Sequence, residues 1–312
     1  MYSRFKFLNI LNFSVSFFIF SGCSMLEIDE NSEDLAVEEN SENADENSVF
    51  VPLEVESGLI EMEKKDNSIY ITPEMVLIPS GTAVINDRVN NNLIKINISY
   101  EYFISKYEIS FEEYDKFARN TKRALPNDSG WGRGKQPVIN VSYDDAVAYA
   151  EWLSQKSGDF YRLPSEAEWE LAHNLNSLNL EESEFEIGSH KFFNGGVENL
   201  KYYGWFSENS AESTHQIGAK MPNSWNIYDT IGNVWEWCQD SYQQNLIGIP
   251  TDGKPRQNKK SDEKVVKGGS WSEPYQNLKN SNRLGFLSSL KMNDTGFRLI
   301  METRQKKKIL KK

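Results

Sequence analysis

All eight tryptophans of this 312-residue chain fall between Trp131 and Trp271, where many of its tyrosines and phenylalanines also lie. Each buried aromatic side chain removes a large area from water. A region this rich in aromatics can therefore form a substantial core with little regular secondary structure. We expect one loop-rich domain whose core contains most of these tryptophans.

The ends of the chain differ from this region in composition. Residues 27–48 contain ten Asp and Glu and no base, whereas residues 304–312 contain six Lys and Arg and no acid. The acidic segment has too little apolar surface to fold, and self-repulsion favours an extended tether; specific binding of a partner by its acids is the alternative. The basic tail is interpreted as a solvated end, with contact to anionic lipid or another subunit as the alternative.

The N-terminus resembles a bacterial lipoprotein signal. Two early bases precede an apolar run, residues 7–20, that is too short to span a bilayer. The run ends in Phe20-Ser21-Gly22-Cys23, which resembles a lipobox. This implies that residues 1–22 are removed and that Cys23 carries lipid, which holds the protein at a membrane of the bacterial cell envelope, facing the periplasm or the exterior. The alternative is an ordinary cleaved signal beside an accidental cysteine.

Charge and cysteine content argue against a nucleic-acid binder and against a fold held together by several disulfides. The net charge of −12 argues against a nucleic-acid binder, because such binding depends on a basic surface. The chain has two cysteines, which allow one disulfide at most, and lipidation of Cys23 would leave Cys238 as the only thiol.

We divide the chain into the signal (1–22), the lipidated cysteine with its acidic tether (23–68), one domain (69–303) and the basic tail (304–312).

The domain shows signals for both helices and strands. Three helix starts are indicated by capping boxes, in which a serine and an acid three residues later satisfy free backbone donors. These pairs are Ser110 with Glu113, Ser142 with Asp145, and Ser165 with Glu168. Short apolar runs such as residues 75–78, 102–104 and 265–266 are typical of strands. The pattern predicts an α+β domain without an internal repeat.

Seven spaced motifs resemble those of the formylglycine-generating enzyme family, also called the sulfatase-modifying-factor domain. They occur in the family's order over about 225 residues. The resemblance implies an α+β fold related to the C-type-lectin fold, with short strands, a few helices and much irregular structure. The motifs are Met75-Val-Leu-Ile-Pro-Ser-Gly81, Phe103-Ile-Ser-Lys-Tyr-Glu-Ile-Ser110, Gln136-Pro-Val-Ile-Asn-Val-Ser142, Tyr161-Arg-Leu-Pro-Ser-Glu-Ala-Glu-Trp-Glu170, Asp229-Thr-Ile-Gly-Asn-Val-Trp-Glu-Trp237, Lys267-Gly-Gly-Ser-Trp271 and Gly296-Phe-Arg298.

One of these motifs predicts a structural calcium site. Calcium takes about six to eight oxygens from carboxylates and carbonyls, and this motif has two carboxylates seven residues apart around a Gly-Asn turn. The resemblance implies ligation by the side chains of Asp229 and Glu236 and the main-chain oxygens of Gly232 and Val234. The alternative is a simple turn whose acids cap nearby backbone. For the family's second calcium site, in a stretch that is shorter here, Asn209 is a candidate.

The resemblance also implies copper chemistry that this chain lacks the residues to support. Catalytic members hold copper by two thiolates five residues apart, shortly after the Gly-Gly-Ser motif, and copper(I) prefers such soft ligands. Counting without gaps from Ser270 puts these positions at Glu273 and Leu278, and no cysteine follows Cys238. Copper is therefore not expected, and Cys238 is interpreted as a buried structural thiol.

No other enzyme class is indicated, because the three histidines are far apart and lack the spacing of a helical zinc pair. Ser270 and Trp235 match family positions that line the substrate groove, although a turn hydroxyl and a core ring are equally good interpretations. We therefore expect a membrane-anchored, non-catalytic lipoprotein that binds a protein or peptide partner, or a ligand, in the cell envelope. The alternatives are an oxidoreductase acting on protein cysteine and a structural envelope component.

Overall fold

A computed structural model describes residues 69–87, 89–90, 92–173, 197–278 and 282–302. The predicted signal, Cys23, the acidic segment 27–48 and the basic tail lie outside these residues. Among the described helices, none is long and apolar enough to cross a membrane.

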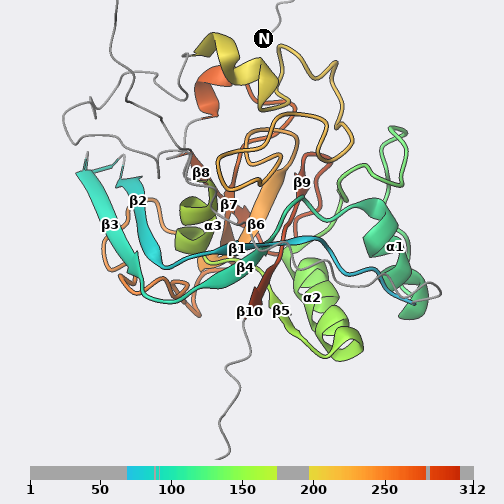
Figure 1. Cartoon of the computed structure of the whole chain (residues 1–312), viewed down its shortest axis with the longest axis horizontal. Helices are drawn as coiled ribbons and strands as arrows, with labels where there is room; N and C mark the ends of the chain where they lie inside the picture. Colours follow the sequence, from blue (N-terminus) through green and yellow to red (C-terminus); the bar gives the residue numbers. More distant parts are fainter. Residues whose placement is uncertain (1–68, 88, 91, 174–196, 279–281, 303–312) are drawn as a thin grey trace, which may run out of the picture. The chain divides into compact units, whose positions relative to one another are not determined.

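Within the described residues, short strands form two four-stranded sheets and one two-stranded sheet (Figure 1). One sheet has the order β1-β4-β10-β5, another has the order β8-β7-β6-β9, and β2 pairs with β3. The pairings are antiparallel except that of β6 with β9. The strands are β1 (Met75–Ile78), β2 (Gly81–Asp87), β3 (Asn92–Ile98), β4 (Tyr102–Ser105), β5 (Phe160–Arg162), β6 (Trp235–Ser241), β7 (Glu263–Lys267), β8 (Arg283–Leu287), β9 (Thr295–Gly296) and β10 (Ile300–Glu302).

The three described α-helices begin where the capping boxes predict. They are α1 (Phe111–Asn120), α2 (Tyr143–Ser157) and α3 (Glu166–His173). Two short 3₁₀ helices, η2 (Val197–Tyr202) and η3 (Tyr275–Asn277), are also described. The reciprocal side-chain and backbone hydrogen bonds of a capping box are present at all three predicted serines. Helix α2 ends at Gly158, whose φ of 84° is the left-handed conformation that glycine adopts without steric cost. The predicted strand segments are confirmed as β1 and as parts of β4 and β7.

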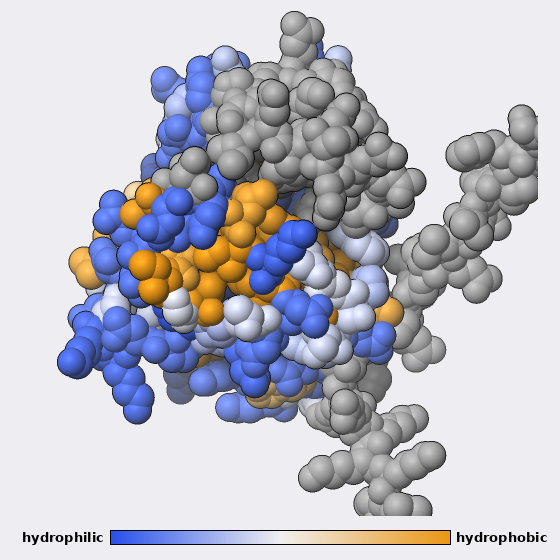
Figure 2. All heavy atoms as spheres, turned by 90° about the vertical axis from the view of Figure 1, so that its left-hand side faces the viewer, coloured by the Kyte–Doolittle hydropathy of each residue, from blue (hydrophilic) through white to orange (hydrophobic). Residues whose placement is uncertain are grey.

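The core has two main clusters. One lies between α1, α2 and the strand β6 and contains a network of rings in contact: Tyr114, Phe117, Tyr149, Trp152 and Phe297. The other joins the β2–β3 pair to β4, α3 and the loop that contains Leu246 and Ile249. On the face at the β2–β3 side, apolar side chains gather around a hollow of about 360 Å³ whose lining includes Ile94, Ile247 and Ile249 (Figure 2).

The tryptophans divide evenly between core and surface. Four are buried, namely Trp152, Trp169, Trp235 and Trp237. The other four, Trp131, Trp205, Trp225 and Trp271, remain partly exposed. Half of the tryptophans are therefore core residues, fewer than the expected majority. The buried rings lie on α2, α3 and β6, whereas the partly exposed rings lie in loops.

Candidate functional site

The candidate site is a buried polar centre where three distant segments meet. The chain leaving β4 lies beside the chain entering β10, since Ile109 N donates to Phe297 O at 2.9 Å and Ser105 N donates to Leu299 O at 2.8 Å. The turn that precedes β6 completes the centre. This arrangement brings together Glu108, the Asp229–Glu236 motif and Arg298.

The Asp229–Glu236 turn depends on backbone conformations that few residues adopt. Asp229, Gly232 and Asn233 have φ values of 55°, 71° and 58°. A side chain at Gly232 would collide with the carbonyl oxygen of Trp205, so only glycine fits there. Gly232 N donates to Gly268 O at 2.9 Å, and Asn233 N donates to Trp205 O at 2.8 Å. The turn is therefore fixed against two other loops.

Glu236 and Arg298 form a fully buried ion pair. Arg298 donates to both carboxylate oxygens of Glu236, at 2.6 Å and 2.7 Å, and both side chains are 0% exposed. Trp169 Nε1 also donates to Glu236 Oε2, at 2.6 Å. Burial alone lowers the pKa of Arg298, but the charge and hydrogen bonds of Glu236 raise it above its ordinary value. Glu236 is thus the internal counterion of Arg298.

Glu108 connects the turn to β4. Its carboxylate accepts from Asn233 Nδ2 at 2.6 Å and from Val234 N at 3.1 Å. Burial raises the pKa of Glu108 well above its ordinary range, and the charges of Asp229 and Glu236 raise it further. Sequence reasoning missed this residue, although it lies two positions before the first capping serine inside a quoted motif. Its role depends on contacts across 125 residues of chain.

Asp229 is the acid in this centre with unused hydrogen-bonding capacity. Its Oδ2 accepts from Gly218 N at 2.6 Å, whereas its Oδ1 is buried without a hydrogen-bond partner. Burial raises the pKa of Asp229 to about 6. A buried carboxylate oxygen without a donor is a position where a cation or a proton would be stabilised.

Of the two carboxylates predicted to bind calcium, only that of Asp229 has an oxygen without a hydrogen-bond partner. Asp229 has an available oxygen, while both oxygens of Glu236 are engaged by Arg298 and Trp169. The described residues contain no cluster of three or more His, Cys, Asp or Glu arranged for a metal. Asn209 uses its side-chain oxygen to accept from Phe206 N at 2.8 Å. As paired here, Glu236 does not fit a calcium ligand and Asp229 does.

Apolar packing closes the loop that contains Glu273 and Leu278, the two positions counted from Ser270. Leu278 is 3% exposed and packs with Leu200, Phe206 and Ile231. Its side chain also lies against Gly269, where a Cβ would collide with it. Glu273, the other counted position, accepts from Asn277 Nδ2 at 2.8 Å. Neither position offers a soft metal ligand.

The two predicted groove residues are buried. Ser270 is 0% exposed and Trp235 is 1% exposed. Trp235 packs edge-on against Phe286, and the Ser270 hydroxyl contacts that of Ser272 at 3.0 Å. The nearby partly exposed ring is that of Trp271, which meets Trp131 edge-to-face at 5.1 Å. In this structure a ligand arriving from solvent would meet this tryptophan pair before Ser270 or Trp235.

A second buried charge cluster lies beside the same turn and was not predicted. Lys267 pairs with Glu170 at 2.8 Å, and Arg283 donates to both oxygens of Glu166 at 2.6 Å and 2.9 Å. Cys238 is buried nearby, as predicted for a structural thiol, and burial raises its pKa well above the ordinary value. The thiolate form, which binds metals, is therefore disfavoured.

Fold and site together define an α+β domain of sulfatase-modifying-factor type. The profile described as "Sulfatase-modifying factor enzyme 1-like domain" matches residues 61–303. The chain belongs to this family. The fold class expected from the sequence is confirmed.

Individual relatives agree with this assignment. The chain is 32% identical over 154 residues to the formylglycine-generating enzyme of Thermomonospora curvata, covering 47% of this chain and 48% of that protein. It is 28% identical over 286 residues to the Chlamydia pneumoniae serine/threonine-protein kinase pkn1, covering 81% and 42%. The chain thus matches half or less of these two relatives. The structure of PvdO from Pseudomonas aeruginosa has a TM-score of 0.63 at 26% identity, covering 74% of this chain and 95% of that chain.

Proposed function

We propose that this protein is a non-catalytic sulfatase-modifying-factor module, anchored by lipid in the bacterial cell envelope, that binds a protein or peptide partner or another ligand. The observation that carries this proposal is the copper loop. Catalysis by the family's chemistry requires two thiolates there, and this chain has Glu273 and Leu278.

The packing of Leu278 supports the absence of copper binding at this loop. A buried leucine in contact with Leu200, Phe206 and Ile231 contributes to stability, so the position has acquired a structural role. The remaining thiol does not substitute for the missing pair. Cys238 is on β6, fully buried, and its raised pKa keeps it protonated.

The relatives support a use of this domain outside cysteine oxidation. The match to pkn1 covers most of this chain but less than half of that protein. The domain therefore occurs joined to regions that this chain does not match, in a protein named for another activity. The partly exposed Trp131–Trp271 pair provides a surface on which a partner can stack or pack.

The proposal is tested with a sulfatase-type peptide containing Cys-x-Pro-x-Arg. The purified chain is incubated with copper(I), oxygen, thiol reductant and this peptide, and the formylglycine-generating enzyme of Thermomonospora curvata serves as the positive control. We expect no mass change in the peptide and no stoichiometric copper after desalting. Conversion of the peptide's cysteine would sink the non-catalytic assignment.

Anchoring is tested separately from catalysis. The full chain expressed in a bacterium should partition into the detergent phase, and a Cys23→Ser variant should move to the aqueous phase. Partitioning of both into the aqueous phase would contradict lipid attachment. A mass shift mapped to Cys23 would identify the modification directly.

We further propose that Asp229 contributes to a structural calcium site together with the main-chain oxygens of Gly232 and Val234. The unpartnered Oδ1 of Asp229 supports this role. Calcium would supply the positive charge that this oxygen lacks. Glu236 could join only by giving up part of its pairing with Arg298.

A further inference from the structure

The strand β2 is a sheet edge without the features that usually protect such an edge. It has seven residues and pairs with β3 along its whole length, from Gly81 opposite Ile98 to Asp87 opposite Asn92. No other described strand pairs with β2. Edge strands are commonly shortened, bulged or interrupted by proline or lysine, which hinders pairing with another chain. The sequence of β2 contains neither residue, and its register with β3 has no bulge.

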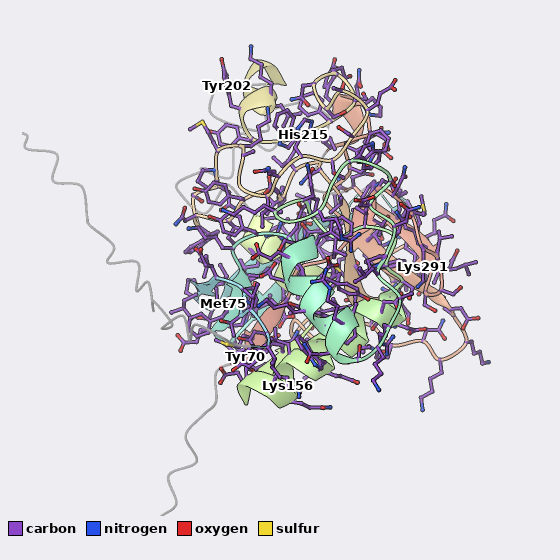
Figure 3. All side chains as sticks on the ribbon, turned by 90° about the vertical axis from the view of Figure 1, so that its right-hand side faces the viewer. Tyr70, Met75, Lys156, Tyr202, His215 and Lys291 are labelled. Carbon is purple, nitrogen blue, oxygen red and sulfur yellow. The ribbon has the colours of Figure 1, made fainter. Side chains whose placement is uncertain are left out.

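The edges of the two four-stranded sheets are shorter than β2. Strands β1, β5 and β9 have four, three and two residues, and β8 has five. Pro79 follows β1, and the segment before β1 is packed onto α2, where the rings of Tyr70 and Trp152 meet edge-to-face with centroids 6.5 Å apart. Figure 3 shows Tyr70 and Met75, the first residue of β1, at the same end of the domain as Lys156 of α2. None of these edges offers as long a template as β2.

A contact of β3 shows which backbone groups of β2 face outward. Asn97 N donates to Thr251 O at 3.1 Å and therefore not to Thr82, the residue opposite it on β2. In an antiparallel pair, residues that exchange hydrogen bonds alternate with residues that do not. Thr82, Val84 and Asn86 therefore direct their N–H and C=O groups away from β3. Within the described part of the chain, these groups have no hydrogen-bond partner.

The core covers one face of β2 and leaves the outward-facing residues accessible. Helix α3 packs on the face that bears Ala83 and Ile85, both 0% exposed. On the other face Thr82 is exposed, and Val84 and Asn86 are half-buried. The free hydrogen-bonding groups of the edge thus belong to residues that solvent reaches. Their chemistry is complementary to that of another extended backbone.

We propose that β2 pairs with β2 of a second copy of this chain, antiparallel, so that two β2–β3 pairs form one four-stranded sheet. A two-fold axis at Val84 places this residue opposite Val84 of the partner subunit, and Thr82 opposite Asn86 of the partner subunit. The residues of each such pair exchange two backbone hydrogen bonds. Pairing of identical edges closes after two copies, because each copy uses the same surface.

The side chains of β2 are compatible with an identical strand. Valine meets valine and threonine meets asparagine, so the pairing avoids like charges in opposite positions, which destabilise a sheet. The one charged residue of β2 is Asp87, which would lie opposite Gly81 of the partner subunit. Its carboxylate accepts from Asn90 Nδ2 at 2.7 Å and from Leu246 N at 3.1 Å. These contacts hold the acid within its own chain.

We expect the association to be weak and reversible. Pairing along one strand buries less surface than a standard interface of about 1,600 Å². Attachment of both copies to one membrane would raise their effective concentration and so favour the pair. The pairing itself requires neither lipid nor the absence of catalysis, so its failure would leave the function proposed above unchanged.

Sedimentation equilibrium of the purified full chain tests the pairing. We expect a monomer–dimer equilibrium that shifts toward the dimer as the protein concentration rises. Amide hydrogen exchange at Thr82, Val84 and Asn86 should slow several-fold under the conditions that favour the dimer, because paired N–H groups are protected. A chain that is monomeric at all concentrations would overturn the proposal, and so would a dimer without protection of these three amides.

Two double variants at the same positions test the register. Thr82→Lys/Asn86→Lys places like charges opposite each other in two pairs and should weaken dimerisation several-fold. Thr82→Lys/Asn86→Glu places opposite charges there and should dimerise at least as well as the wild type. Within one chain residues 82 and 86 lie roughly 13 Å apart, so this compensation requires a second copy. The first variant is also less acidic than the wild type, whose net charge is −12, so general repulsion between copies cannot explain its weaker dimerisation.

Val84→Pro provides an independent test. The N–H of Val84 faces away from β3, so proline removes a donor to the second copy without removing a hydrogen bond between β2 and β3. We expect a monomer at concentrations where the wild type is a dimer, with circular dichroism of all variants as the control for folding. Equal dimerisation of the two double variants would show that residues 82 and 86 do not meet, and would contradict the proposal.

Discussion

The Asp229–Glu236 turn and the Ser270–Leu278 loop are in contact with each other, yet the buried contacts of the first are mainly polar and those of the second mainly apolar. The turn keeps its acids, buried with Arg298 and Glu108. In the loop, Leu278 is buried and its side chain fills the space against Gly269.

The two regions also differ in how their stability is generated. In the turn, Glu236 is stabilised by its pairing with Arg298, so removing one partner leaves the other buried without compensation. In the loop, stability comes from apolar contacts that depend on volume. Mutations should therefore separate the two regions by size of effect and by dependence on pH and calcium.

The largest effect is expected from Arg298→Met. This change leaves Glu236 charged and buried without its counterion, which typically costs about 3–5 kcal/mol. Chemical denaturation at pH 7 measures the change in the free energy of unfolding. Because the pair is a unit, Glu236→Met/Arg298→Met should cost less than Arg298→Met alone; equal or greater loss in the double variant would contradict the pairing.

Leu278→Ala should follow, with a loss of about 3–4 kcal/mol from the cavity and the missing contacts. Leu278→Met keeps most of the volume and should cost less than about 1.5 kcal/mol. Both are measured by the same denaturation experiment. An unchanged free energy of unfolding in Leu278→Ala would show that the loop is loosely packed and would contradict a stabilising role for Leu278.

In the metal-free protein, the pH dependence of the free energy of unfolding should be about 2–3 kcal/mol smaller in Asp229→Asn than in the wild type. The pKa of Asp229 is raised to about 6 from an ordinary 3.8. A raised carboxyl pKa means that stability is greatest below the unfolded value and is lost as pH rises through the folded one. Relative to Asp229→Asn, the wild type should therefore lose stability between about pH 4 and pH 6, measured with chelator present. If the free energies of unfolding of the wild type and of Asp229→Asn changed in parallel with pH, the pKa of Asp229 would not be raised by folding.

The smallest effect is expected from calcium. At ten times its dissociation constant, a ligand that binds only the folded state adds about 1.4 kcal/mol. Calcium should raise the midpoint of thermal unfolding of the wild type at pH 7 and leave that of Asp229→Asn unchanged. An equal midpoint of thermal unfolding for the wild type in calcium and in chelator would contradict calcium binding by the folded protein.

Local patterns in the sequence were enough to predict the family, the α+β fold class, the helix starts and several strands. These follow from local signals: a capping box involves residues three apart, and a strand pattern spans a few residues. The absence of thiols after Cys238 is also a property of the sequence alone.

The contacts that the motif residues make became clear only in the folded chain. Glu236 was predicted as a metal ligand, but it meets Arg298 from 62 positions further along the chain. For Ser270 and Trp235 the sequence left open a groove lining or a turn hydroxyl and a core ring, and in the structure both side chains are buried. Glu108, Lys267 and Leu278 likewise acquire their roles from partners that no local pattern identifies. Desolvation and charge compensation depend on which groups the fold buries together, and that is a property of non-local contacts.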